Sequence, residues 1–189
     1  MSMPAFDLEA ESIRRFTRRE YHELGRTGIF DQERVELVHG IIRRKPVIGP
    51  RHAYTVGQLM KLFVRLVGSQ AEVRVQQPVA ASDDSEPEPD VAVCPPGNYL
   101  DDHPEVAWLI VEVAASSLKM DRGEKARVYA AMGALEYWVV NLKDGVVEVH
   151  RAPGPEGYAT VEIAQRGAEL RVPGLPDVVV AVDQILPPA

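Results

Sequence analysis

A glutamate inside a continuous apolar run is the feature that most constrains the fold of this chain. Glu112 lies in the segment Trp108–Ala114, whose other members are all apolar. A run of this kind is typical of a strand buried on both faces of a sheet. A carboxylate in such a strand is costly unless it is paired, protonated or bound to a cation. The sequence therefore predicts a central strand that carries an acid with a cation beside it.

A second carboxylate stands at the start of the preceding apolar run. Asp90 follows Pro89 and leads into Val91–Val93. Because sequential strands usually lie side by side, we expect Asp90 and Glu112 to converge and offer the oxygen ligands that Mg²⁺ or Mn²⁺ prefers. The backbone carbonyl of Val113 is a candidate third ligand. Asp90 also fits a carboxylate that caps the turn after a proline, whereas Glu112 has no comparable structural explanation.

The helix expected over residues 121–132 places three further groups on one face. Asp121, Lys125 and Tyr129 follow each other at intervals of four residues,. Lys125 could reach an attacking water or a phosphate oxygen. The same three residues also fit a solvated ion pair beside a packed tyrosine, with Asp121 stabilising the helix N-terminus. Ser116 and Ser117 precede this helix without a Gly-x-Ser-x-Gly motif, so no serine nucleophile is expected,.

Two other candidates depend on how the chain folds. Glu36 lies in a hairpin expected over residues 34–45 around His39-Gly40, and it joins the site only if the fold brings it near Asp90,. His52 begins an amphipathic helix expected over residues 52–67, where it could touch substrate or serve a structural role. The five histidines show no metal-ligand spacing, so zinc is not expected,.

Length and composition indicate one domain, residues 1–189, with a helical N-terminal extension over 1–30 and a C-terminal β extension over 152–189. With 46% hydrophobic residues, 189 residues can bury a core,. A capping box at Thr17 predicts a helix from Arg18 to about Leu24, ended by Gly25 and Gly28. Strands are expected over 72–79, 90–94, 107–114, 135–141, 146–151, 169–172 and 178–182. The pattern predicts one mixed sheet with helices packed on it.

Charge and apolar patterning limit the classes of function. The net charge of −7 works against a simple nucleic-acid binder,. Basic residues cluster early in the chain, at Arg14, Arg15, Arg18, Arg19, Arg43, Arg44, Lys45 and Arg51, whereas residues 83–105 hold eight acids and no lysine or arginine. This polarity suits a phosphate-binding face beside a cation-binding one, although each charge also fits a solvated surface. Apolar stretches are strand-length and a single Cys94 forbids an internal disulfide, so we expect a cytoplasmic protein without membrane contact.

Taken together, these motifs resemble the PD-(D/E)XK nuclease superfamily and, within it, the bacterial Uma-type family of restriction-endonuclease-like proteins. The resemblance covers roughly residues 17–151 and rests mainly on the order of the motifs. The matching segments are Glu36–Gly40, Pro89-Asp90, Val111–Val113, Asp121 with Lys125 and Tyr129, and Gly133–Val140.

The resemblance implies an α/β (α+β) fold with a restriction-endonuclease-like core, in which a mixed central sheet is flanked by helices. It implies Mg²⁺ held by Asp90 and Glu112, with Glu36 as an additional acid. The superfamily's lysine two residues after the glutamate is replaced here by Ala114. In the Uma-type family a lysine from the following helix takes that role, which makes Lys125 the candidate. Ala114–Ser117 also departs from the family's usual Ser-Pro-Ser.

Three hypotheses follow from these expectations. The first is a Mg²⁺- or Mn²⁺-dependent endonuclease acting on nucleic acid, with DNA as the expected substrate, a homodimer as the expected assembly, and His52, Tyr129 and Asp121 as substrate-positioning groups. The second is a catalytically silent nuclease-fold protein that acts in binding or regulation, as the acidic charge and the missing in-strand lysine suggest. The third, a small-molecule hydrolase, lacks a cofactor fingerprint or a nucleophile motif.

Overall fold

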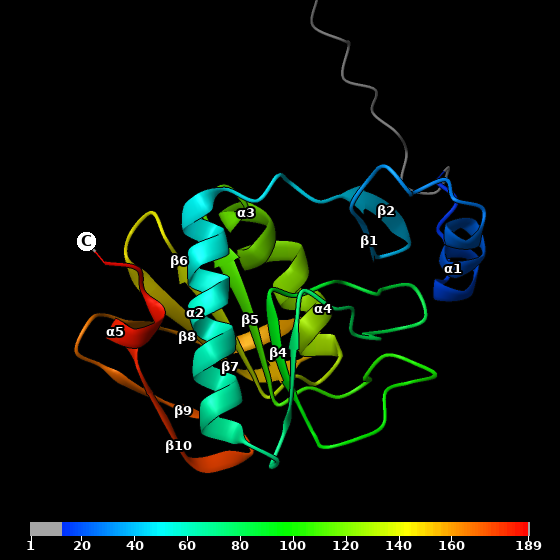
Figure 1. Ribbon diagram of the computed structural model, residues 1–189. Helices are drawn as coiled ribbons and strands as arrows, with labels where there is room; N and C mark the ends of the chain where they lie inside the picture. Colours follow the sequence, from blue (N-terminus) through cyan, green and yellow to red (C-terminus); the bar gives the residue numbers. More distant parts are fainter. Residues whose placement is uncertain (1–12, 189) are drawn as a thin grey trace, which may run out of the picture.

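The fold is built around a six-stranded mixed sheet in the order β3-β4-β5-β6-β7-β8 (Figure 1), which confirms the predicted fold class. The computed structural model describes residues 13–188. Its central strands are β3 (Glu72–Val75), β4 (Val91–Cys94), β5 (Leu109–Ala114), β6 (Glu136–Asn141), β7 (Val146–Gly154) and β8 (Gly157–Ala164). β5 and β6 pair in parallel, and the other neighbours pair antiparallel. The connection from β5 to β6 is therefore a crossover, and it carries the helices of the candidate site.

Helices cover both faces of this sheet. α2 (Pro50–Val67) lies across one face, and α4 (Ala126–Ala131) lies on the other (Figure 1). The first core layer joins Leu59 and Phe63 of α2 to Val111 and Trp138 of the sheet. The second layer includes Tyr129 of α4, packed against the opposite face. Burying apolar side chains on both faces supplies most of the driving force for this arrangement.

β5 is the central strand that its apolar sequence predicted. All six residues from Leu109 to Ala114 are buried, Glu112 included. β4 pairs with β5 so that Val91 lies opposite Val111, which confirms that the strands following Asp90 and containing Glu112 are neighbours. Asp90 itself stands just before β4 and not within it.

α2 begins two residues earlier than the sequence predicted, because Pro50 occupies its first turn, where proline has no hydrogen bond to lose,. Val56, Leu59 and Phe63 are buried as the periodicity indicated. Met60 and Val64 belong to the same apolar pattern but are 40% and 56% exposed. The face of α2 that is buried against the sheet is thus narrower than the set of apolar residues along the helix.

The predicted helix over 121–132 is a single helical segment with a change of winding. It runs through α3 (Leu118–Met120), the π-helical turn η2 (Asp121–Lys125) and α4, and Gly133 follows with a φ of 81°. Insertion of a π turn shifts the residues after it around the helix axis, and such turns frequently occur at functional sites. Here the π turn contains both Asp121 and Lys125.

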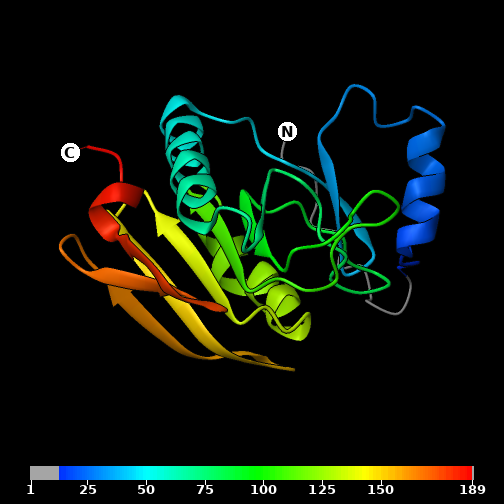
Figure 2. The same ribbon diagram turned by 60° about the horizontal axis from the view of Figure 1, so that its bottom comes forward.

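A smaller layer stands beside the sheet at the N-terminal side. It contains α1 (Arg18–Arg26) and the hairpin β1 (Val35–Val38) and β2 (Ile41–Arg44), seen in blue at the right of Figure 2. The capping box at Thr17 is present, but α1 continues through Gly25. The hairpin turns at His39 and Gly40, both with positive φ, as a two-residue turn of the primed type requires,. A Cβ on Gly40 would lie 2.4 Å from Cβ of Arg15, so the turn also needs glycine for space.

The C-terminal region corrects two predictions. β7 extends to Gly154, and β8, which is not among the predicted strands although residues 159–163 alternate between apolar and polar, forms the edge of the central sheet. β8 lies inside the expected 152–189 extension, yet it belongs to the core sheet. β9 (Glu169–Val172), β10 (Leu175–Ala181) and α5 (Val182–Ile185) then cover the face that α2 occupies. Of the expected extension over 1–30, residues 1–12 lie outside the described part of the chain.

Over residues 13–188, no helix combines the length and the apolar character needed to cross a bilayer,.

Candidate active site and metal centre

Asp90 is held in a fixed orientation by three neighbours. Its Oδ2 accepts a hydrogen bond from the backbone N–H of Val113 at 2.8 Å and lies 2.9 Å from Nε2 of His52. Its Oδ1 accepts from the side-chain amide of Gln76 at 3.2 Å. Val113 is free for this contact because β4 begins at Val91, opposite Val111, so β5 beyond Val111 has no strand partner on this side.

The contact with Val113 also bears on the predicted backbone ligand. The N–H and C=O of one strand residue point to the same side of the strand. Because the N–H of Val113 points to Asp90, its carbonyl points toward the same edge of β5. This orientation suits the expected role of the Val113 carbonyl beside the carboxylate of Asp90.

Glu112 is 5% exposed and receives two donors on the same oxygen. Nζ of Lys125 lies 2.8 Å from Oε1, and the hydroxyl of Tyr129 donates to the same atom at 2.7 Å. Both donors come from the crossover helix, one turn apart. The sharing of Oε1 leaves Oε2 as the oxygen with capacity for another ligand.

Lys125 joins Glu112 to the N-terminal hairpin. Its Nζ lies 3.2 Å from Oε2 of Glu36, and all three side chains are at least nine-tenths buried. The same Oε2 accepts the backbone N–H of Glu88 at 3.2 Å. The fold thus meets the condition set by the sequence for Glu36, because the hairpin places it against the Asp90 region.

Asp121 lies at the same cavity with an unsatisfied atom. Its Oδ2 is buried and has no hydrogen-bond partner among the side chains and backbone of the described residues. An orphaned buried carboxylate oxygen is rare and points to an unplaced ion or water. Asp121 is therefore better suited to the carboxylate group around a cation than to a solvated ion pair.

Charge in this cluster is unbalanced. Burial, above all, raises the pKa of Glu112 to about 8, and the nearby carboxylates of Asp90, Asp121 and Glu36 act in the same direction while Lys125 opposes them. Burial likewise raises the pKa of Asp121. For Lys125, burial lowers the pKa, but the carboxylates of Glu112 and Glu36 outweigh it and raise the pKa above its usual value. One buried ammonium among four carboxylates leaves a negative excess that a divalent cation would balance.

Asp90 shows the opposite behaviour. Burial is the largest influence and raises its pKa, but the hydrogen bonds and charge of His52, the Val113 N–H and Gln76 together outweigh it and hold the pKa below the usual range. Asp90 is thus kept ionised while Glu112 is disposed to take a proton. An ionised carboxylate beside oxygen donors is the ligand set that Mg²⁺ and Mn²⁺ prefer.

These groups line one cavity of about 250 Å³. Carboxylates and Lys125 form one part of its lining, and Ser116 and Ser117 stand at its side. The remaining polar lining is basic and comes from the hairpin and the start of α2: Arg34, Arg44, Lys45 and Arg51. Acidic and basic side chains thus line the same cavity, whereas the expected cation at this site stays a prediction.

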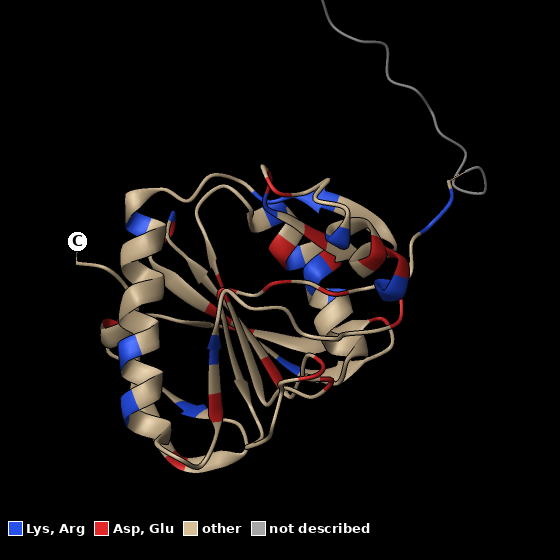
Figure 3. Ribbon diagram, turned by 45° about the vertical axis from the view of Figure 1, so that its right-hand side comes forward, with Lys and Arg blue, Asp and Glu red and all other residues tan. Residues whose placement is uncertain are grey.

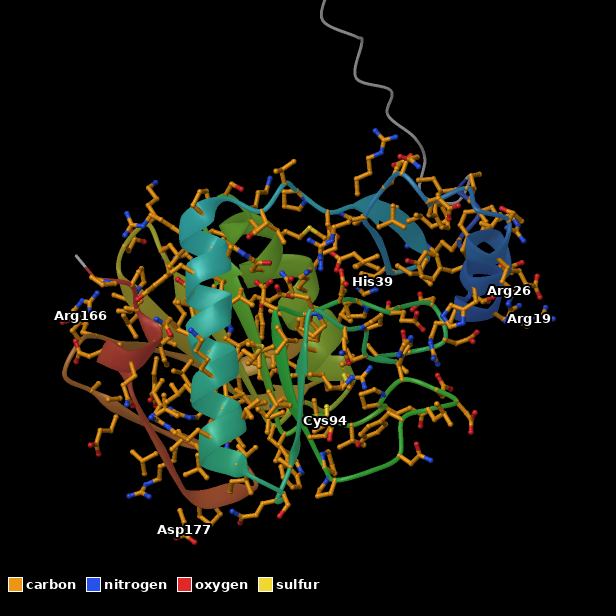
Figure 4. All side chains as sticks on the ribbon, viewed as in Figure 1. Arg19, Arg26, His39, Cys94, Arg166 and Asp177 are labelled. Atoms are coloured by element: carbon orange, nitrogen blue, oxygen red, sulfur yellow. The ribbon has the colours of Figure 1, made fainter. Side chains whose placement is uncertain are left out.

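The basic and acidic segments also contact one another directly. Arg18 binds Glu86 at 2.8 Å and Asp102 at 2.6 Å, and Lys45 binds Glu88 at 2.6 Å. Figure 3 shows the resulting mixture of blue and red in the layer around the hairpin. Much of the positive charge expected to meet phosphate is therefore neutralised within the protein. In contrast, Arg19 and Arg26 lie on the outer side of α1 and extend toward solvent (Figure 4).

Of the predicted positioning groups, His52 lines the cavity and Tyr129 is enclosed in the core. His52 contacts Asp90 and lines the cavity, so substrate can reach it. Tyr129 is fully buried and donates to Glu112, so the contact that the structure shows is with that carboxylate, and its role in positioning substrate stays a prediction. Gln76 was missed because a lone glutamine at the end of a strand carries no sequence signal. Cys94 (Figure 4) is the last residue of β4, at the end of the strand away from Asp90.

Comparison with known proteins supports the fold and identifies a family. Residues 18–183 match the family model described as "Uma2: Putative restriction endonuclease". The chain is also similar to a crystal structure from Anabaena variabilis described as "a putative nuclease belonging to DUF820", with 15% sequence identity, a TM-score of 0.69, and coverage of 82% of this chain and 90% of that one. At this identity the likeness shows a shared fold. No curated protein matches the sequence.

Proposed function

Because this chain belongs to the Uma2 family of restriction-endonuclease-like proteins, we propose that it is a divalent-metal-dependent endonuclease that hydrolyses phosphodiester bonds in DNA. The observation that carries the proposal is the buried cluster of Glu36, Asp90, Glu112 and Lys125 in a cavity with basic lining. A structural ion pair would need one carboxylate beside Lys125. With Asp121, whose Oδ2 has no partner among the described residues, the cavity holds four carboxylates, more than such a pair requires,.

Asp90 and Glu112 are the proposed metal ligands, with the carbonyl of Val113 as a third donor. Asp90 is held ionised by His52, Gln76 and the N–H of Val113, so it presents charge without rearrangement. Glu112 would lose its proton when a cation binds, because the positive charge opposes the effect of burial. When bound, Mg²⁺ or Mn²⁺ would polarise the scissile phosphate and lower the pKa of the attacking water.

Lys125 is the proposed charge stabiliser. Its ammonium is fixed between Glu112 and Glu36 and is permanently charged, so it donates protons in hydrogen bonds and does not act as a general base. From this position it would orient the water and stabilise negative charge that develops on the phosphate. Glu36 holds the ammonium in place, and Tyr129 holds the carboxylate of Glu112.

The substrate proposal rests on the basic lining. Arg34, Arg44 and Arg51 are exposed residues at the cavity. Arg34 pairs with Glu88 and Arg44 with Glu33, so they could contact phosphate only by sharing or exchanging these partners, whereas Arg51 has no acidic partner among the described residues,. Their number is small and the net charge is −7, so binding would depend on the bound cation as well as on these arginines. Cleavage is accordingly expected to weaken as salt rises.

The direct test is cleavage of supercoiled plasmid and of single-stranded oligonucleotides with Mg²⁺ or Mn²⁺, with a chelator control. Glu112→Gln should abolish cleavage, and Glu156→Gln, an exposed glutamate in the β7–β8 turn, should retain it. Circular dichroism would verify folding of each variant. Binding of nucleic acid in the absence of divalent cations, together with no cleavage of any tested substrate in their presence, would contradict the proposal. It would favour the catalytically silent binding protein.

A further inference from the structure

A second cluster of metal-ligating side chains lies outside the cavity, on the N-terminal layer. It consists of His22 in α1, Glu86 in the loop before Asp90, and His103 in the loop before β5. One ligand atom from each residue lies within 4.8 Å of the other two. Glu86 is buried, and both histidines are partly exposed. The three residues come from segments 64 and 17 positions apart, which is why no ligand spacing is visible in the sequence.

The orientation of the two imidazole rings distinguishes this cluster from an ordinary ion pair. Nε2 of His22 lies 2.7 Å from Oε1 of Glu86, and Nε2 of His103 lies 3.8 Å from the same oxygen. The first distance is a hydrogen bond, whereas the second is too long for one. His103 thus directs a ring nitrogen toward the carboxylate without bonding to it. The ring planes are nearly perpendicular, at 88°, so they do not stack.

We propose that His22, Glu86 and His103 form a binding site for a divalent metal ion, with Zn²⁺ as the preferred ion. Two imidazoles and one carboxylate are a ligand set that zinc uses, with water in the fourth position. Ligand atoms around tetrahedral zinc lie about 3.3 Å apart for metal–ligand bonds of about 2.0 Å. The distances of 2.7 Å and 3.8 Å to Oε1 bracket this value, so shifts of about half an ångström would bring each histidine to the right distance from Glu86. The ligand atoms of the two histidines lie within 4.8 Å of each other, so metal binding would draw the histidines together by up to about 1.5 Å,.

Arg18 holds Glu86 in an orientation that suits a metal-ligating carboxylate. Nε of Arg18 donates to Oε2 of Glu86 at 2.8 Å, on the oxygen that does not face the histidines. Hydrogen bonds of this kind orient a ligating carboxylate. Next to His103, Nη2 of Arg74 lies 3.5 Å from Nδ1 of the imidazole. Metal at Nε2 puts a proton on Nδ1, so the guanidinium of Arg74 must move away from it; this guanidinium lies over the ring of Tyr99.

At this location a bound metal ion would hold in place the hairpin that carries Glu36. The backbone of Glu86 bonds in both directions with Leu37 of β1, with N to O distances of 2.8 Å and 3.4 Å. Leu37 is the neighbour of Glu36, which holds Lys125. A metal ion at Glu86 would therefore join α1, two loops and β1, and would hold the hairpin against the sheet without contacting the cavity.

Zinc titration by calorimetry, followed by thermal unfolding with and without Zn²⁺, tests the site. The protein is first treated with chelator and then dialysed. We expect one Zn²⁺ to bind and raise the unfolding temperature. His103→Ala and His22→Ala should each weaken this binding at least about tenfold. His39→Asn, which changes a histidine at the β1–β2 turn outside the cluster (Figure 4), should bind as the wild type does.

Two further variants separate this site from the carboxylate cavity and from misfolding. Asp90→Asn should keep the zinc bound at the histidines, whereas the histidine variants should keep Mn²⁺ binding in the cavity. Arg74→Met should bind zinc at least as tightly as the wild type, because the competing donor is removed, which a folding defect would not produce. Absence of zinc binding, or binding that is lost in Asp90→Asn and retained in His103→Ala, would overturn the proposal.

Discussion

Lys125 and Glu112 meet across 13 residues of sequence, with Nζ 2.8 Å from Oε1, although one lies on a helix and the other in the middle of a buried strand. The π-helical turn that contains Lys125 brings its ammonium back over the strand. Ala114, two residues after Glu112, stands where the superfamily has its lysine. The ammonium group thus reaches the glutamate from the helix that follows. Substitution of Lys125 tests whether catalysis uses this contact.

Replacement of Lys125 by methionine should lower the cleavage rate by about 100-fold or more, because the charge that faces the developing phosphate charge is lost. The same change leaves Glu112 and Glu36 buried without their cation, which should cost about 3 kcal/mol of stability in the absence of metal. Rates would be measured under single-turnover conditions and stability by urea unfolding. Lys143→Met, in the exposed β6–β7 turn, is the control and should change neither.

Replacement of Asp90 by asparagine should abolish Mn²⁺ binding in the cavity. An amide keeps the size of the side chain but removes the charge, and its NH₂ group would oppose the donors that Asp90 now accepts from Val113 and Gln76. Calorimetric titration with Mn²⁺ measures the effect. Asp177→Asn, which alters an exposed aspartate at the opposite end of the molecule (Figure 4), should bind as the wild type does. Equal affinity in both variants would remove Asp90 from the ligand set.

Metal affinity should rise with pH up to about pH 8. Burial raises the pKa of Glu112 to about 8, and a cation binds the deprotonated form, so each bound ion displaces a proton below that pH,. Titrations between about pH 6 and pH 9, in buffers of different ionisation enthalpy, would count the released protons. An affinity that does not change over this range would show that Glu112 is already ionised or is not a ligand.

The stability of the metal-free protein should respond to pH in the opposite sense. The pKa of Glu112 is higher in the folded state than its ordinary value of 4.5. The contribution of this carboxyl to stability is therefore fully present below pH 4.5 and is lost as pH rises toward 8,. Urea unfolding of wild type and Glu112→Gln across this interval isolates the contribution, since the glutamine variant should lose this part of the pH dependence.

Replacement of Tyr129 by phenylalanine should lower cleavage and shift its pH dependence upward. The hydroxyl donates to Oε1 of Glu112, and a hydrogen bond to a carboxylate favours the ionised form,. Its loss should raise the pKa of Glu112 further, so that a higher pH restores activity. Tyr158→Phe, which removes a hydroxyl bonded to the carbonyl of Ala134, is a matched control. A uniform loss of rate at all pH values would contradict a role through Glu112.

Core packing gives a prediction that does not depend on function. Phe63 of α2 is fully buried with its ring 6.2 Å from that of Trp138. Phe63→Ala should cost about 3 to 5 kcal/mol by leaving a cavity. Met60→Ala, on the exposed side of the same helix, should change stability by no more than about 0.5 kcal/mol,. Comparable losses in both variants would show that α2 packs differently.

The sequence could predict much of this fold because its strongest patterns are local. The apolar run around Glu112 and the His39-Gly40 turn each specify an element almost alone. β8 was missed although residues 159–163 alternate; its apolar side chains Val161 and Ile163 are exposed, so its position at the sheet edge depends on pairing with β7 and not on burial. The extent of β3 was overestimated: Gln76 adopts a positive φ and ends the strand three residues before Val79.

Candidate residues were easier to select than their partners. Glu112 and Asp90 stand out because a charge next to buried strand residues needs an explanation. Gln76 and the cluster at Glu86 carry no such signal, since their meaning depends on segments brought together only by folding. Tyr129 was found by helical spacing, but spacing could not reveal that the residue is enclosed on all sides.

The hairpin that carries Glu36 has a consequence for the order of folding. β1 and β2 form a sheet of their own. They contact Glu86 and Glu88 in the loop before β4, about 50 residues away, and reach the crossover helix through the Glu36–Lys125 pair, 89 residues apart. Contacts across such a separation carry a large loop-closure cost and tend to form late. The sheet and its helices could therefore assemble while the hairpin is still undocked. Such an intermediate would have a nearly complete core and an incomplete set of acids, so catalytic competence would be acquired in the final step of folding and lost in the first step of unfolding.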